Sequence, residues 1–320
     1  MPLPSHRLRE VRLALMIEGQ EGVTWDDWLA LAQACEEHGV EALFRSDHYL
    51  SQSAALEKGS HDAWTTLAAL AARTRRLRLG TLVSPVTFRH PSLLANAVTT
   101  ADHVSGGRVE LGIGAGWMVP EHTAYGFPFP ETSERMEMLA EQLEIVHRLW
   151  TEERTDFEGR HYRLDGAPGL PKPVQRPHPP ILVGGSGGRG TTRPAARFAD
   201  EYNTPFASPE EFAERRRRVS ETCEREGRDP DTMRFSLMTG CLIGEERARR
   251  LYRERERGVD FDTWLADYRE ASLVGTLDEI AARIREYEEA GCERIMLQHL
   301  LHDDLEAVAL IGRELAPAVA

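Results

Sequence analysis

The regular alternation of short apolar segments with longer amphipathic segments constrains the fold of this chain more than any other feature. The apolar, strand-like segments lie at residues 11–17, 41–45, 77–83, 108–113, 180–183, 201–204, 234–243 and 294–298. Helical patterns alternate with them at residues 24–38, 62–75, 91–104, 131–150, 191–198, 209–226, 245–257, 277–290 and 304–315. Alternating strands and helices predict a parallel sheet with crossover helices, and about eight such units favour a closed barrel over an open sheet. We therefore predict an α/β fold, a (β/α)8 TIM barrel, with residues 1–320 as a single domain.

Two segments interrupt this rhythm and are interpreted as insertions. Residues 153–180 are rich in proline and glycine and end in PKPVQRPHPP, with one small hairpin expected around residues 160–164. Residues 261–272 form the second inserted segment.

Charge and composition exclude several classes of function. The net charge of −13 argues against a nucleic-acid partner, because phosphate backbones require a basic surface. No apolar run approaches the ~18 residues of a membrane span, and the N-terminal residues lack a signal-peptide pattern. The four cysteines form no CxxC pair, so we expect no zinc or other metal site, no disulfide and a cytoplasmic location.

In a (β/α)8 barrel, chemistry is carried by the loops that follow the C-terminal ends of the strands. Ser46-Asp47-His48-Tyr49 follows the second predicted strand directly. A histidine there can exchange protons near neutral pH, and an adjacent carboxylate can tune it. The alternative is a helix-capping aspartate beside a surface histidine.

A glycine-rich exit, Gly112 to Trp117, follows the fourth predicted strand. It is not a dinucleotide-binding GxGxxG, because tryptophan occupies the position of the last glycine. Small residues here allow a flat ligand to approach the backbone. Trp117 either walls a ring system or belongs to the core.

A second glycine-rich loop, Gly184 to Gly190, follows the fifth predicted strand and precedes a helix. Its backbone amides and the helix N-terminus favour a phosphate site, although it lacks the GK[ST] ending of a P-loop. The alternative is a surface connection. From residue types alone, the two loops after the third strand are interpreted as connections shaped by proline. They are Leu82-Val83-Ser84-Pro85 and Phe88-Arg89-His90-Pro91.

Taken together, these loops resemble the luciferase-like monooxygenase family. The resemblance rests on SDHYL, GTLVSPVTFRHPSLLA, GGRVELGIGAGWMVPEHTAYGFPFP, PPILVGGSGG and GTLDEIAARIREYEEAGCERIMLQ, which occur in order over nearly the whole chain. It implies a luciferase-like barrel with insertion segments, which binds FMN or the deazaflavin F420 at the C-terminal rim.

The Asp-His pair is similar to that of the F420-dependent branch, which implies that Asp47 contacts the cofactor and that His48 is catalytic. The resemblance also implies a non-proline cis peptide at Leu82-Val83, behind the cofactor ring, and a phosphate grip by the loop of the fifth strand. The expected cofactor-contacting residues are Asp47, Leu82, Val83, Ser84, Gly116, Trp117, Glu121, Gly184, Gly185, Ser186 and Gly187.

One position departs from the sequence pattern of the F420-dependent branch. F420-dependent sugar-phosphate dehydrogenases place a catalytic glutamate directly after the glycine-rich exit, whereas this sequence has Trp117 there and Glu121 one helical turn later. We therefore do not predict a sugar-phosphate substrate.

The prediction is an F420-dependent oxidoreductase that transfers a hydride to or from an unidentified small organic substrate, and by analogy a homodimer. A polar ring edge suits the Asp47-His48 pair, and Arg189 and Arg193 suit a polyglutamate tail. The alternatives are an FMN-dependent monooxygenase that uses O2 and a non-catalytic protein that binds a flavin or deazaflavin. A Schiff-base lyase is disfavoured because the two lysines, Lys58 and Lys172, lie outside the predicted strands.

Overall fold

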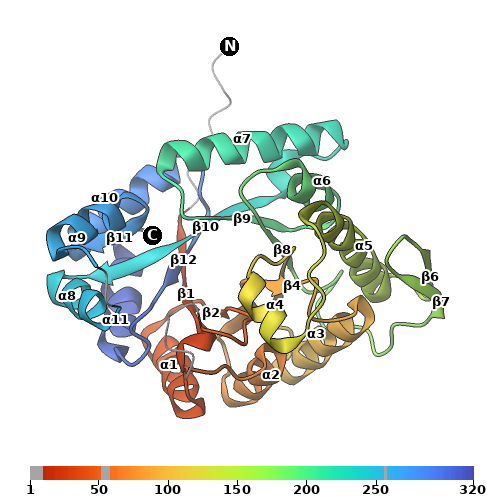
Figure 1. The fold of residues 1–320 in the computed structure, drawn as a ribbon, viewed down its shortest axis with the longest axis horizontal. Coiled ribbons are helices and arrows are strands. Elements are labelled where there is room, and N and C mark those ends of the chain that lie inside the picture. The colour runs from red at the N-terminus through yellow and green to blue at the C-terminus, as the bar shows by residue number, and fades with distance from the viewer. Residues whose placement is uncertain (1–9, 52–57, 256–257) are drawn as a thin grey trace.

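The computed structural model describes residues 10–51, 58–255 and 258–320, which form a closed barrel of eight parallel strands surrounded by helices (Figure 1). The barrel strands are β1 (Arg12–Ile17), β2 (Ala42–Arg45), β3 (Arg78–Thr81), β5 (Val109–Gly114), β8 (Ile181–Gly184), β9 (Glu201–Pro205), β10 (Arg234–Ile243) and β12 (Arg294–Gln298). They neighbour one another in that order, and the pairing of β12 with β1 closes the ring. The predicted (β/α)8 TIM barrel is confirmed.

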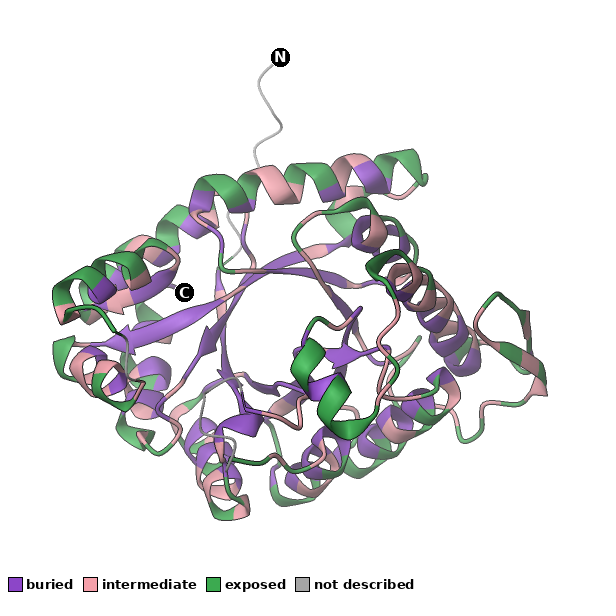
Figure 2. Ribbon diagram, viewed as in Figure 1, coloured by how far each residue is buried: buried purple, intermediate pink, exposed green. Residues whose placement is uncertain are grey.

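Most of the helices surround the strands and bury one face against them (Figure 2). They are α1 (Trp25–His38), α2 (Ala63–Arg73), α3 (Pro91–Ser105), α4 (Val119–Tyr125), α5 (Thr132–Thr151), α6 (Arg189–Phe198), α7 (Pro209–Arg225), α8 (Glu245–Glu254), α9 (Phe261–Glu270), α10 (Leu277–Glu289), α11 (Leu305–Leu310) and α12 (Ala316–Ala318). Capping boxes at Thr24, Ser208 and Thr276 satisfy the first amides of α1, α7 and α10. These start signals are local, which is why the helices could be read from the sequence.

The barrel interior has a small apolar layer in its middle and charged residues at the N-terminal ends of its strands. Met16, Phe44, Leu182 and Met296 are fully buried in that layer. Below them, Arg294 at the start of β12 forms ion pairs with Glu110 of β5, at 2.8 Å, and Glu201 of β9, at 2.7 Å. This end of the barrel is therefore closed by side chains, and the open end lies where the strands terminate.

Three segments of the structure differ from the sequence prediction or add detail to it. The first insertion contains the hairpin of β6 (Thr155–Glu158) and β7 (Arg163–Ala167), which projects from the side of the barrel (Figure 1). The second insertion is helix α9 followed by a strand, β11 (Ser272–Gly275), which pairs with β10 outside the ring and was not predicted. The short helix α4 was also not predicted, because proline and glycine bound a segment of only seven residues.

Candidate active site

The C-terminal ends of the strands surround a cavity of about 920 Å³. Of the residues predicted from the sequence, eight line it: His48, Leu82, Val83, Gly116, Trp117, Gly184, Gly185 and Ser186. Asp47, Ser84, Glu121 and Gly187 do not line it in the described structure, and the first three are buried. The cavity is thus built by the predicted loops, and Asp47, Ser84 and Glu121 lie behind its lining.

His48, directly after β2, is held at the cavity wall by a carboxylate from a distant loop. Its Nδ1 lies 2.8 Å from Oε2 of Glu121 in α4, whose side chain is fully buried. Because an ionised carboxylate only accepts hydrogen bonds, Nδ1–H donates, and Nε2 remains free of protein partners within the described residues. Burial lowers the pKa of His48, but the hydrogen bond and charge of Glu121 outweigh this and raise the pKa above its ordinary value.

Glu121 is itself fixed by backbone amides. Its Oε1 accepts hydrogen bonds from the amide of Tyr49 and from that of Leu50, the latter at 3.0 Å. Burial raises the pKa of Glu121, but His48 and these amides lower it below its ordinary value. Glu121 therefore holds His48 in place through a hydrogen bond and does not itself line the cavity.

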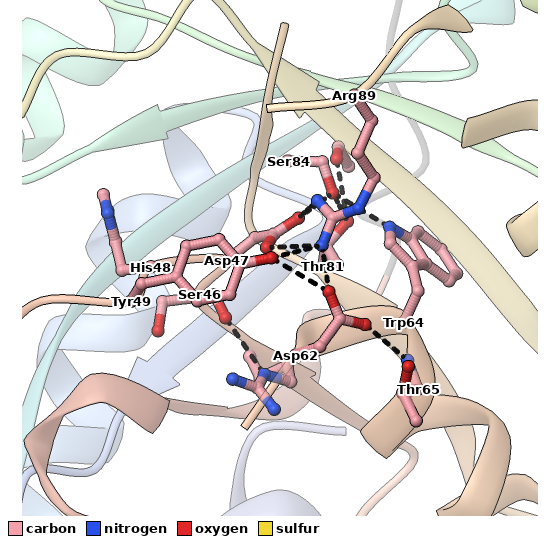
Figure 3. Close-up of polar contacts among 12 residues, drawn as sticks. Ser46, Asp47, His48, Tyr49, Asp62, Trp64, Thr65, Thr81, Ser84 and Arg89 are labelled. Atoms are coloured by element: carbon pink, nitrogen blue, oxygen red, sulfur yellow. Dashed lines mark hydrogen bonds and ion pairs between the residues drawn. The ribbon is translucent and has the colours of Figure 1, made fainter. Parts of the chain in front are cut away.

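Asp47 points away from His48 into a buried ion-pair cluster (Figure 3). Its carboxylate lies 2.5 Å from the guanidinium of Arg89, which also pairs with Asp62 at 2.5 Å. Tyr49 joins the cluster, because its hydroxyl donates to Asp62 at 3.0 Å and accepts from Arg89 at 3.2 Å. In this structure the carboxylate of Asp47 is paired with Arg89, and its contact with the polar edge of a cofactor ring stays a prediction. The sequence analysis missed Arg89, because it interpreted this loop from residue types alone as a simple connection.

The Leu82-Val83 peptide bond is cis, as the family resemblance implied. The segment is held on both sides: Thr81 donates to the carbonyl of Gly112 at 2.8 Å, and Ser84 donates to Asp47 at 2.7 Å while it accepts from Trp64 at 3.0 Å. Leu82 and Val83 consequently present a fixed apolar bulge to the cavity. Ser84 supports this bulge from behind.

Glycines beside the bulge are required by its packing. A Cβ atom on Gly114 would lie 2.7 Å from Cγ2 of Val83, and one on Gly184 would lie 3.2 Å from Cγ1. Side chains at these positions would displace Val83. The glycine-rich strand exits thus leave a smooth wall beside an apolar bulge, as a flat ligand requires.

The second glycine-rich loop offers fewer free amides than predicted. The amide of Gly185 donates to the carbonyl of Asn203 at 2.9 Å, and that of Gly187 donates to the hydroxyl of Tyr202 at 3.0 Å. The amides of Ser186, Gly188, Arg189 and Gly190 have no acceptor in the part of the chain described, and the last three open α6. A phosphate group would therefore be held by the helix N-terminus more than by the preceding glycines.

A polar wall on the other side of the mouth was not predicted. Glu18 follows β1 and its carboxylate accepts from Gln298 at 2.6 Å and from Gln20 at 2.8 Å. Ser46 in turn donates to Gln20 at 2.5 Å. Glu18 and Gln298 could have been found by applying to β1 and β12 the same strand-end rule that indicated His48.

Other possible sites are absent from the described residues. No group of three His, Cys, Asp or Glu side chains there could hold a metal ion, and the four cysteines are buried and unpaired. None of the described helices is long and apolar enough to cross a membrane.

Comparison with known proteins matches the sequence to one enzyme family over most of its length. The profile described as luciferase-like monooxygenase matches residues 12–294. An F420-dependent glucose-6-phosphate dehydrogenase from Nakamurella multipartita is 33% identical over 288 residues, which cover 86% of this chain and 74% of that protein.

Solved structures share the fold over nearly the whole chain. The monooxygenase RslO1 from Streptomyces bottropensis is 28% identical, with a TM-score of 0.78 over 97% of this chain and 98% of that one. An F420-dependent secondary alcohol dehydrogenase, solved with an F420-acetone adduct, is 20% identical, with a TM-score of 0.83 over 97% and 99%. The last likeness concerns the fold alone.

Proposed function

The chain belongs to the luciferase-like monooxygenase family, and from that premise we propose that it is an F420-dependent oxidoreductase that transfers a hydride between F420 and a small organic substrate. The observation that carries this proposal is the His48–Glu121 pair at the cavity wall. Converting an alcohol to a carbonyl compound, or the reverse, moves a proton together with the hydride. His48 is a proton-exchanging group held in a fixed tautomer at the place where such a substrate would lie.

The residues of this structure fit a deazaflavin. A tricyclic ring needs a flat apolar support, which Leu82 and Val83 provide, and close backbone approach, which Gly114 and Gly184 allow. A phosphate needs amide donors, which the start of α6 provides through Gly188, Arg189 and Gly190. A cavity of about 920 Å³ lies within the size range of small-molecule and cofactor sites.

F420, when bound, supplies a two-electron carrier that accepts or donates a hydride. The chain's own residues supply orientation and proton transfer. Glu121 fixes Nδ1–H of His48, so that Nε2 is the atom that gives a proton to a carbonyl oxygen or takes one from a hydroxyl. The raised pKa of His48 increases the protonated fraction at any given pH, which suits the reducing direction.

The cluster of Asp47, Arg89 and Asp62 positions the catalytic loop without touching the cavity. Arg89 ties Asp47, the residue before His48, to Asp62 at the start of α2. Since Ser84 also donates to Asp47, the loop of His48 and the Leu82-Val83 bulge are linked through one carboxylate. The proton-transfer group and the ring support are consequently fixed relative to each other.

A monooxygenase that uses FMN and O2 is the second candidate, favoured by the 28% identity to RslO1. The two are separated by titrating the purified protein with F420 and with FMN in both redox states, followed by assay of hydride transfer with alcohols and ketones. F420 binding together with substrate-dependent reduction of F420 supports the proposal. FMN binding with no measurable F420 binding contradicts it, and F420 binding without turnover of any substrate favours a non-catalytic binding protein.

We also retain a homodimer as a proposal by analogy with the family. Light scattering coupled to size-exclusion chromatography measures the number of chains directly.

A further inference from the structure

The loop between β8 and α6, residues 184–190, is where the phosphate of the cofactor is proposed to bind, and its amides are not all equivalent. The amide of Gly187 donates to the hydroxyl of Tyr202 at 3.0 Å. The amides of Ser186 and Gly188, on either side of it, have no acceptor in the described part of the chain. Two donors available to a ligand therefore flank one donor that the protein itself holds.

Tyr202 lies in β9, which pairs with β8. The residue is 2% exposed and is not part of the cavity lining. Its hydroxyl lies 2.8 Å from Oγ1 of Thr191 in the first turn of α6, and Thr191 donates to the carbonyl of Gly188 at 3.0 Å. A hydroxyl has a single proton to donate, so Tyr202 is the donor to Thr191. Burial raises the pKa of Tyr202, which keeps that proton in place near neutral pH.

These contacts form a continuous chain of hydrogen bonds between the middle of the loop and the start of the helix. The chain runs from the amide of Gly187 through the hydroxyls of Tyr202 and Thr191 to the carbonyl of Gly188. The loop and the first turn of α6 are therefore joined through one buried tyrosine hydroxyl. Removing that hydroxyl would leave both the Gly187 amide and the Thr191 hydroxyl without this partner.

The loop also packs directly on the same hydroxyl. A Cβ atom on Gly185 would lie 2.5 Å from the Tyr202 hydroxyl and 2.7 Å from Oγ1 of Thr191, which is closer than such atoms approach. Gly187 has a φ of 80°, in the left-handed region that favours glycine. The packing on Tyr202 and the turn at Gly187 thus explain both glycines without reference to a ligand.

Holding this loop matters because of its composition. Residues 184–190 contain five glycines, and such a segment has many conformations when nothing holds it. A ligand that had to order these residues would bind more weakly, because the ordering costs conformational entropy. Tyr202 fixes the loop through contacts within the protein, so this ordering does not depend on the ligand.

Resting on the proposed F420 function, we propose that Tyr202 is a positioning residue for the phosphate of the cofactor. It holds the glycine loop and the start of α6 in the arrangement that presents their free amides, and it does not touch the cofactor. Because Leu82 and Val83 support the ring elsewhere in the cavity, the contribution of Tyr202 to binding depends on the phosphate and not on the ring.

The first test compares two ligands in the parent protein and in Tyr202→Phe. They are F420 and Fo, the same deazaflavin with its ribityl chain but without the phosphate and the tail. Titration followed by deazaflavin fluorescence gives the dissociation constant of each. We expect Tyr202→Phe to weaken F420 binding roughly three- to tenfold, the equivalent of one lost hydrogen bond. Fo binding should change by less than about twofold, because Fo has no phosphate to place.

Tyr287→Phe is the matched control. Tyr287 in α10 is as deeply buried, at 1% exposed, and its hydroxyl donates to the carbonyl of Ala207 at 2.7 Å. The variant removes one buried tyrosine hydroxyl outside both the glycine loop and the cavity lining. The affinities for F420 and for Fo should therefore both stay near those of the parent protein.

A second measurement needs no ligand. NMR hydrogen exchange of the parent protein should show the Gly187 amide exchanging more slowly than those of Ser186 and Gly188, since only the first has a partner. In Tyr202→Phe the Gly187 amide should exchange as fast as its neighbours. The parent measurement tests the proposal even if Tyr202→Phe does not fold, and the exchange rates decide it if Fo binds too weakly to titrate.

Several results would overturn the inference while leaving the proposed function intact. These are an unchanged F420 affinity in a folded Tyr202→Phe protein, equal weakening of F420 and Fo, an equal loss of F420 affinity in Tyr287→Phe, or a Gly187 amide in the parent protein that exchanges as fast as its neighbours. Absence of F420 binding by the parent protein instead contradicts the proposed function, while the exchange rates still report whether Tyr202 holds the loop.

Discussion

Two arginines at opposite ends of the barrel each lie between two carboxylates, yet their surroundings assign them different tasks. Arg294 joins Glu110 and Glu201 at the closed end, where all three side chains are 1–2% exposed. Arg89 joins Asp47 and Asp62 at the open end, where Asp62 is 37% exposed and the residue after Asp47 is His48, the proposed proton-transfer group. The same arrangement of charges closes the barrel at one end and positions a reactive loop at the other.

The difference follows from what each cluster joins. The Arg294 cluster connects strands β5, β9 and β12 across the interior, and Arg78 adds a contact to Glu110 at 2.5 Å. The Arg89 cluster connects loops that follow β2 and β3, where the backbone has left the sheet. Stability is therefore expected to depend on the closed end, and activity on the open end.

The largest effect is expected from Arg294→Met. It removes the buried cation that Glu110 and Glu201 share and leaves them only the partly exposed Arg78 and Arg234. Breaking a buried pair by removing one partner costs about 3–5 kcal/mol. Urea denaturation measures the loss. Arg234→Met, at the partly exposed edge of the same cluster, is the control and should cost about 1 kcal/mol or less. Equal losses of unfolding free energy in the two variants would show that the burial of the arginine does not determine the cost of removing it.

His48→Ala tests the open end. The variant should lose about 10²–10⁴-fold in turnover, the usual contribution of acid–base help. Its affinity for F420 should change much less, and its urea midpoint should stay near that of the parent protein. Unchanged kcat with weakened F420 binding would mean that His48 only binds the cofactor.

Glu121→Gln should alter the pH dependence of the same step. In the reducing direction the protonated His48 is required, so kcat/KM is flat at low pH and falls as pH rises through its raised pKa. Without the Glu121 charge that pKa drops, so the falling limb moves to lower pH, with a loss of about 10–100-fold near neutral pH from poorer positioning. An NMR titration of the imidazole checks the pKa directly. If the falling limb of the kcat/KM profile does not move in Glu121→Gln, the group that titrates is not His48.

Arg89→Met is the counterpart of Arg294→Met. Because Asp62 is partly exposed and can be hydrated, the loss of stability should be smaller, about 1–3 kcal/mol. Turnover should nevertheless fall, since the His48 loop loses its tie to α2. The comparison between the two ends fails if Arg89→Met costs as much stability as Arg294→Met and leaves kcat unchanged in the folded fraction.

The smallest effect is expected from Gly188→Asp at the proposed phosphate site. A Cβ there meets no neighbour within 4 Å, and aspartate is a favourable N-cap for α6, so the fold should tolerate it. The new carboxylate competes with the phosphate and should weaken F420 binding roughly tenfold. Gly188→Ala is the matched control with little change. Gly185 is unsuitable, because a Cβ there would lie 2.5 Å from the Tyr202 hydroxyl.

The local pattern of the sequence was sufficient to predict the barrel and the position of most of the site. Strand and helix periodicities and helix caps depend on neighbouring residues, so the eight barrel strands could be read from residue types alone. The rule that loops after parallel strands share one rim then brought His48, Val83, Trp117 and Gly184 to one cavity. Short elements bounded by proline and glycine, such as α4, and the outer strand β11 carried too little periodic signal.

The partners of the charged groups were decided only by the tertiary structure. Asp47 and His48 are adjacent in sequence and looked like one pair, but Asp47 meets Arg89, 42 positions away, and His48 meets Glu121, 73 positions away. Neighbouring side chains at a strand end point in opposite directions. Each charge therefore pairs with whatever the fold brings to its own side, and spacing along the chain does not reveal which residue that is.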